Sequence, residues 1–116
     1  MDRTLAPHQR RGWGVSNICF GLGYGDGFPD ASRATVRFNR ENRLEVLTGG
    51  VEYGQGLLNV VAQIAAEELG VPMSQVDVIW ADTERTHESG STSASRQTYF
   101  TGNAVRIAAS ELREQV

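Results

Sequence analysis

The chain has 116 residues, 40% of them hydrophobic, which is enough for one domain with a buried core. Its net charge of -3, without a basic stripe or an aromatic-spaced platform, argues against a nucleic-acid-binding protein. The single cysteine, Cys19, excludes a disulfide framework and a cysteine-rich metal site and favours a reducing compartment.

The first third of the chain is rich in glycine. Residues 1–12 predict an irregular lead-in, with no apolar run that would mark a signal peptide or a membrane span, so we expect a cytoplasmic protein without membrane contact. Residues 13–116 form the domain, and Trp13–Phe20 predicts its first strand. Glycines then recur at every second position from 21 to 27, which favours a loop over an extended segment with one bare face.

The next two segments predict a hairpin. Apolar and polar residues alternate from 34 to 38, and after a turn at 39–42 a second run places Leu44 and Val46 on one face and Glu45 and Leu47 on the other. A helix pattern follows from Leu57 to Leu69, with apolar residues three and four apart, and Gly70 with Pro72 ends it.

The remaining elements are a strand around Val76–Trp80 and a second helix from about Gly102 to Val116. The order β-β-β-α-β-α predicts an α+β fold in which two helices cover one face of a small mixed sheet of about four strands. Because the last helix pattern reaches Val116 without a cap, we expect a fragment of a larger protein.

Several classes of site are missing. The glycines at 21–27 lack the Gly-x-Gly-x-x-Gly spacing of dinucleotide-binding folds, and a chain without lysine has no P-loop. No Gly-x-Ser-x-Gly nucleophile motif is present. His8 and His87 have no partners at metal-ligand spacing, so we expect neither a metal site nor a catalytic residue within this chain.

Two loop-to-helix junctions suit an anionic ligand such as phosphate, because the first N–H groups of a helix lack intrahelical partners and carry partial positive charge. Gly54-Gln55-Gly56 precedes the first helix, and it is also explained by a tight turn. Thr92 to Thr98 precedes the second helix, and ordinary N-capping accounts for one of its hydroxyls. It accounts less readily for four hydroxyls, a guanidinium and an amide in seven residues.

Four segments follow one another in a distinctive order. They are Glu52-Tyr53-Gly54-Gln55-Gly56, Gln63 to Pro72, Asp82-Thr83, and Thr92 to Thr98 with Gly102-Asn103-Ala104-Val105. Their order and spacing resemble the molybdopterin-binding large subunit of the xanthine dehydrogenase/aldehyde oxidase family. The resemblance extends from about Gly12 to the end of the chain, and the series is specific where each segment alone is weak.

The resemblance implies a role for each junction. The family's Gly-Gln-Gly turn lies against the molybdenum cofactor, which implies cofactor contacts by Gly54, Gln55 and Gly56. The family's Thr/Ser loop binds the cofactor phosphate. Here the implied phosphate-binding residues are Thr92, Ala94, Ser95 and Gln97, with Arg96 in the Ser-Arg pattern that favours molybdopterin cytosine dinucleotide.

The resemblance also implies an activity. Members of the family are molybdenum-dependent oxidoreductases that hydroxylate purines, aldehydes or N-heterocycles, with iron–sulfur clusters and FAD in partner domains or subunits. Their general-base glutamate lies in a later segment, so the chain alone is expected to be inert. The rival hypothesis is a non-catalytic α+β module that self-associates through exposed apolar surface and whose glycines and hydroxyls only cap helices.

Overall fold

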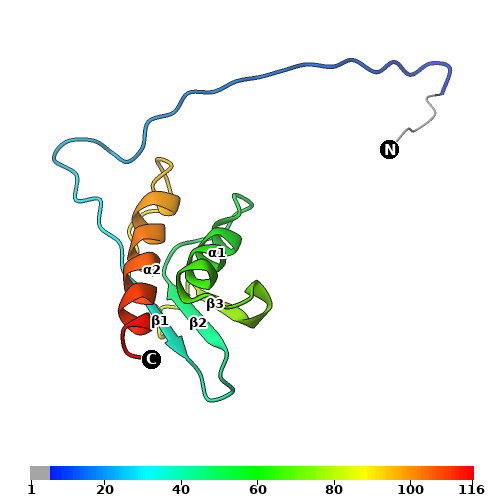
Figure 1. The fold of residues 1–116 in the computed structure, drawn as a ribbon. Helices are drawn as coiled ribbons and strands as arrows, with labels where there is room; N and C mark the ends of the chain where they lie inside the picture. Colours follow the sequence, from blue (N-terminus) through cyan, green and yellow to red (C-terminus); the bar gives the residue numbers. More distant parts are fainter. Residues whose placement is uncertain (1–5) are drawn as a thin grey trace.

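The computed structural model describes residues 6–116, and Figure 1 shows a small sheet with two helices on one of its faces. The elements in chain order are β1 (Ala34–Phe38), β2 (Leu44–Thr48), α1 (Leu57–Leu69), the short 3-10 helix η1 (Met73–Gln75), β3 (Val76–Trp80) and α2 (Gln97–Arg113). β2 is the central strand, antiparallel to β1 and parallel to β3. This mixed sheet with two helices confirms the α+β fold.

The hairpin forms where the alternation predicted it. Val36 pairs with Val46, so both valines lie on the face that the helices cover. At the turn, the side-chain oxygen of Asn39 accepts the backbone N–H groups of Glu41 and Arg43 at 3.0 and 2.9 Å. This side-chain bonding is the usual reason for asparagine in turns.

The first helix has the predicted bounds. Its apolar stripe is fully buried at Val61 and Ala65, which pack on Leu44 and Val46 of the central strand. Gly70 takes a left-handed backbone at φ 67° and donates its N–H to the carbonyls of Ala66 and Glu67. Glycine has no Cβ to strain that conformation, so it ends the helix.

The second helix begins at Gln97, five residues before the predicted Gly102. The prediction started the helix at its apolar stripe, whereas the polar turn before the stripe is already helical. Gly102 lies inside the helix, and a Cβ there would be 2.9 Å from Cδ1 of Ile64 on α1. The glycine therefore lets the two helices approach closely, despite its cost in a helix interior.

The strand predicted at Trp13–Phe20 is not formed, so the described residues contain three strands in the order β-β-α-β-α. Trp13 and Val15 are 96% and 100% exposed, and Figure 1 shows this segment leaving the sheet and helices. A strand needs a neighbour to accept its backbone hydrogen bonds, and no described residue pairs with this one. The glycine loop is confirmed, with positive φ at Gly23, Gly25 and Gly27.

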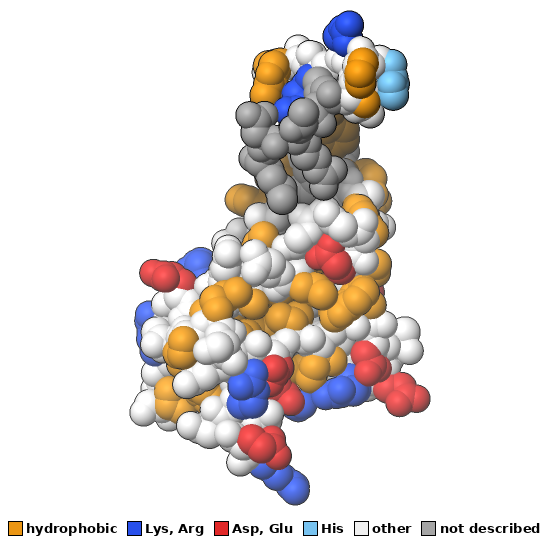
Figure 2. All heavy atoms as spheres, turned by 90° about the vertical axis from the view of Figure 1, so that its right-hand side faces the viewer, with side chains coloured by type: hydrophobic (Ala, Val, Ile, Leu, Met, Phe, Trp, Pro, Cys, Tyr) orange, Lys and Arg blue, Asp and Glu red, His pale blue; other side chains and the backbone are white. Residues whose placement is uncertain are grey.

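One face of the molecule carries exposed apolar side chains. Figure 2 shows hydrophobic side chains in a band across the face that includes α1 and β3, with charged side chains below it. Met73 and Trp80 are 41% and 38% exposed. Among residues 6–116, no helix is long and apolar enough to cross a membrane.

Candidate functional site

Hydrogen bonds join two loops that are about forty residues apart in the sequence. After β2, the backbone N–H of Val51 donates to Oγ1 of Thr92 at 2.9 Å, and the hydroxyl of Tyr53 donates to the carbonyl of Thr92 at 3.0 Å. In the interior beneath these contacts, the buried Oγ of Ser89 accepts the N–H of Gly49 at 2.9 Å. The fold thus brings both predicted junctions together.

The two loops enclose a pocket of about 530 Å³. Its walls combine the Gly-Gln-Gly loop, the Ser/Thr loop and two residues of the N-terminal segment: Ile18, Phe20, Tyr53, Gln55 and residues 92–98. No carboxylate lines the pocket, whereas eight of the eleven lining residues carry a hydroxyl, an amide or a guanidinium. A site without carboxylates suits an anion.

The start of α1 is occupied by the protein itself. The carboxylate of Glu52 accepts the backbone N–H groups of Gly54, Gly56 and Leu58 at 2.7, 3.0 and 3.2 Å. These bonds, from Gly56 first, lower the pKa of Glu52 from its ordinary 4.5, although burial opposes them. The expectation of free amides at this junction is therefore wrong, because a phosphate there would meet a carboxylate.

Stability should fall in acid partly through Glu52. Because its pKa is lower in the folded chain, the carboxylate stabilises the fold above pH 4.5, and this contribution is lost as pH falls through the folded pKa. Between about pH 6 and pH 3, we expect the urea midpoint of Glu52→Gln to fall less steeply with decreasing pH than that of the unsubstituted chain. Asp30 and Asp77 also have lowered pKa values, so a slope remains in the variant. An unchanged slope would contradict this assignment.

Gln55 lies on the pocket wall, but its amide is already used. Nε2 donates to the carbonyl of Val51 at 2.7 Å, and Oε1 accepts the N–H of Tyr53 at 2.8 Å. The side chain therefore closes its own loop and presents one edge to the pocket. Gly54 and Gly56 flank it with positive φ of 108° and 83°.

The start of α2 is open. Ala94 and Ser95 both have left-handed backbones, at φ 51° and 53°, immediately before the helix. Within residues 6–116, no acceptor contacts the backbone N–H of Gln97 or Thr98, and the hydroxyls of Ser95 and Thr98 make no hydrogen bond. Unpaired amides and hydroxyls at a helix start are the groups that bind phosphate.

Arg96 and Gln97 face inward and hold this loop from behind. The Arg96 side chain is 1% exposed and forms an ion pair with Asp30 at 2.7 Å. The amide of Gln97 donates to the carbonyl of Ser91 at 3.1 Å and accepts the hydroxyl of Thr101. In this structure these two side chains shape the pocket wall, and neither directs its polar end into the pocket.

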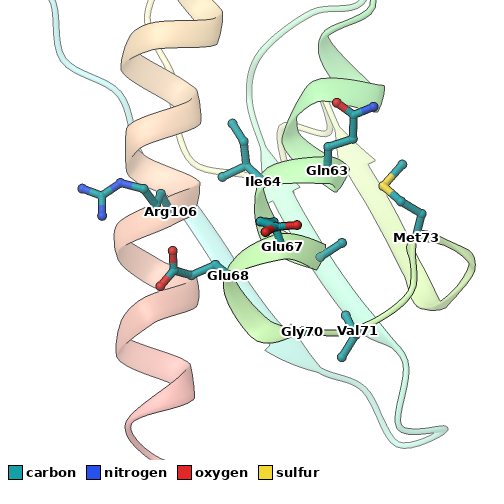
Figure 3. A pocket seen from close by; sticks show the side chains of 9 residues that line it. Gln63, Ile64, Glu67, Glu68, Gly70, Val71, Met73 and Arg106 are labelled. Carbon is teal, nitrogen blue, oxygen red and sulfur yellow. The ribbon is translucent and has the colours of Figure 1, made fainter.

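A larger hollow, of about 780 Å³, lies along α1 and contains none of the predicted residues. Figure 3 shows Glu67 and Glu68 at its rim, with Arg106 on α2 and Met73 on the far side. Two carboxylates at the rim make it a poor phosphate site. The smaller pocket between the loops remains the candidate.

Two carboxylates that support the pocket loops could not be predicted from the sequence. Glu52 belongs to the Glu-Tyr-Gly-Gln-Gly motif, but the motif does not show that its carboxylate accepts the N–H groups that follow. Asp30 stands in no motif, and its partner Arg96 is 66 residues away. Asp82, by contrast, forms a self-contained turn and accepts the N–H groups of Glu84 and Arg85. Among residues 6–116, no three potential metal ligands lie together.

Comparison with known proteins identifies the fold and its relatives. Probable hypoxanthine oxidase XdhD of Escherichia coli K12 is 38% identical over 92 residues, which cover 78% of this chain and 10% of that protein. Aldehyde oxidoreductase of Megalodesulfovibrio gigas is 36% identical over 112 residues, which cover 94% and 12%. The crystal structure of quinoline 2-oxidoreductase from Pseudomonas putida 86 matches with a TM-score of 0.64 and 38% identity, over 71% of this chain and 10% of that one.

The chain therefore spans about a tenth of the length of these relatives. The family described as molybdopterin cofactor-binding domain matches residues 2–116. Its match covers both loops of the pocket and the helices that follow them. The chain belongs to the molybdopterin cofactor-binding domain family.

Proposed function

We propose that this chain forms part of the cradle for the molybdopterin cofactor in the large subunit of a molybdenum hydroxylase. The observation that carries the proposal is the pocket between the two loops, which has open amides and hydroxyls at the start of α2 and no lining carboxylate. These groups fit the phosphate end of the cofactor. The start of α1, filled by Glu52, does not fit a phosphate.

The wall residues divide into two roles. The phosphate oxygens would be bound by the hydroxyls of Ser95 and Thr98 and by the backbone N–H of Gln97. Thr92 and Ala94 would complete that wall. Gln55 on the opposite wall, with Gly54 and Gly56 on either side of it in the chain, would lie against the rest of the cofactor. Arg96 and the side chain of Gln97 would support the phosphate wall from the protein side.

The bound cofactor would supply redox chemistry that hydroxylates a carbon of a purine, aldehyde or N-heterocycle with oxygen from water. This chain's own residues would bind and orient the cofactor. The relatives named as hypoxanthine oxidase, aldehyde oxidoreductase and quinoline 2-oxidoreductase support this range of substrates. Iron–sulfur and flavin groups would lie in partner domains or subunits of a cytoplasmic complex, and this chain alone would be inert.

The cytosine dinucleotide form of the cofactor is a finer proposal. It is supported by the Ser95-Arg96 pattern and by a pocket of about 530 Å³, which exceeds the room that a single phosphate needs. Membership of the cofactor-binding family disfavours the non-catalytic module as the main function. Self-association through the exposed apolar face stays a prediction, which light scattering would test.

A titration with inorganic pyrophosphate tests the phosphate role on the 116-residue chain. In nitrogen-15-edited NMR spectra we expect saturable shifts at the backbone amides of Ser95, Gln97 and Thr98, because these residues line the pocket and their N–H groups have no acceptor within residues 6–116. The amides of Gly54 and Gly56 should shift little, because Glu52 holds them. Cytidine diphosphate should bind more tightly than guanosine diphosphate if the cofactor is the cytosine form.

Matched charge variants control the titration. Ser95→Asp places a carboxylate at the phosphate wall and should raise the dissociation constant by about tenfold. Ser74→Asp makes the same charge change at an exposed position in η1 and should leave it unchanged. Equal weakening by both variants, or shifts that never saturate, would exclude a specific phosphate site.

A further inference from the structure

A buried ion pair lies directly behind the Ser/Thr loop. The side chains of Arg96 and Asp30 are 1% and 12% exposed, and Nε donates to Oδ1 at 2.7 Å. Nη1 of the same guanidinium donates to the carbonyls of Ser89 and Ser91 at 2.9 and 3.0 Å, and Nη2 donates to the carbonyl of Ala31 at 2.6 Å. All three guanidinium nitrogens are therefore bonded inside the protein, and their acceptors lie in two separate segments.

The other oxygen of Asp30 extends the network to the glycine-rich segment. Oδ2 accepts the backbone N–H of Tyr24 at 3.0 Å. The neighbouring N–H of Gly23 donates to the carbonyl of Ala94 at 2.9 Å, and the hydroxyl of Tyr24 is hydrogen-bonded to Oγ of Ser93. Asp30 thus joins the glycine-rich segment to the Ser/Thr loop both through Arg96 and through Tyr24.

The loop that this network holds has an unfavourable backbone. Ala94 and Ser95 are consecutive residues with positive φ, a conformation that L-residues adopt only when the surroundings impose it. The bond to the carbonyl of Ala94 and the anchored side chain of Arg96 restrain this pair from both sides. The same pair directs the chain into α2 and so sets the direction of its first N–H groups.

We propose that Asp30 is a positioning residue of the cofactor site. Its carboxylate fixes the Arg96 guanidinium and the Tyr24 amide, and together these hold Ala94 and Ser95 in the shape that presents the first amides of α2 to phosphate. Asp30 does not line the pocket and would act only through these neighbours. This inference rests on the proposed phosphate role of the α2 start.

The test compares Asp30→Asn with the wild-type 116-residue chain. We expect the dissociation constant for pyrophosphate to rise by about tenfold, because the neutral amide cannot hold the guanidinium as a carboxylate does. The three-bond coupling between the amide hydrogen and Hα of Ala94 and Ser95, which reports φ, should change in the same variant. A residue needed only for stability would shift the urea midpoint without changing these couplings in the folded chain.

Asp77→Asn is the matched control. It breaks another close arginine–aspartate pair, Arg43–Asp77 at 2.5 Å, which lies at the start of β3 and away from the pocket. It should leave both the pyrophosphate affinity and the two couplings unchanged. If Asp30→Asn fails to fold, Asp30→Glu decides, because it keeps the charge but moves the carboxylate by one methylene.

The outcomes separate the two proposals. No saturable pyrophosphate shift in the wild-type chain would defeat the proposed function itself. Wild-type affinity and couplings in Asp30→Asn, or in Asp30→Glu where the first variant does not fold, would overturn only the role of Asp30. Weaker binding with altered couplings, and no effect of Asp77→Asn, would support it.

Discussion

Gly49→Ala should lower the free energy of unfolding by about 2–3 kcal/mol, the upper part of the range for forced overpacking, because the atoms it would meet belong to the backbone. A Cβ at residue 49 would lie well within 3.0 Å of the backbone carbonyl oxygen of His87 and 3.2 Å from the backbone N of Ser89. A backbone atom cannot rotate away as a side chain can. The two loops would have to separate at the point where the Gly49 N–H is bonded to Ser89.

The loss is measurable by urea denaturation followed by circular dichroism. Gly14→Ala is the control, because no atom lies within 4 Å of its Cβ position and its φ is not positive. It should change the free energy of unfolding by less than about 0.5 kcal/mol. Since Gly49 lies where the two pocket loops meet, Gly49→Ala should also weaken pyrophosphate binding. Equal urea midpoints for Gly49→Ala and Gly14→Ala would contradict the close approach of Gly49 to the backbone of His87 and Ser89.

Leu44→Ala should cost about 3 kcal/mol, within the range for leucine truncation in a core. Leu44 is fully buried in the central strand, where it pairs with Phe38 of β1 and Val76 of β3. Removing its side chain leaves a cavity beneath both helices, which a close-packed interior fills only in part. For a domain of ordinary stability, this is a large fraction of the total.

Urea unfolding again supplies the measurement. If the slope of the free energy of unfolding against urea concentration is unchanged, the substitution has changed stability alone. Leu22→Ala is the matched control, because Leu22 is 52% exposed in the N-terminal segment. It should cost less than about 1 kcal/mol. A cost for Leu44→Ala no larger than that of the control would contradict the position of the core.

The outcome at the two helix starts shows how far local sequence patterns extend. The same signal, small residues before an apolar stripe, predicted anion binding at both junctions, yet only the junction at α2 leaves its first N–H groups without an acceptor. The difference comes from Glu52, which lies four residues before Gly56 and whose carboxylate accepts the N–H of Gly56. The residues near a helix start indicate which ligands its N–H groups could bind. The conformation of the preceding turn decides whether a side chain of the protein already occupies those N–H groups.

The sequence alone determined the hairpin, the bounds of α1, the α+β class and the family resemblance. These depend on alternation, helical spacing and capping residues, which act between near neighbours. The tertiary structure decided that Trp13–Phe20 forms no strand among the described residues, because a strand requires a partner that its own residues do not specify. It also decided that Arg96 points inward, since the acceptors that fill its guanidinium include Asp30, 66 residues away. Hydrogen bonds and ion pairs between residues far apart in the sequence leave no local sequence pattern. The pocket between the two loops is therefore visible only in the tertiary structure.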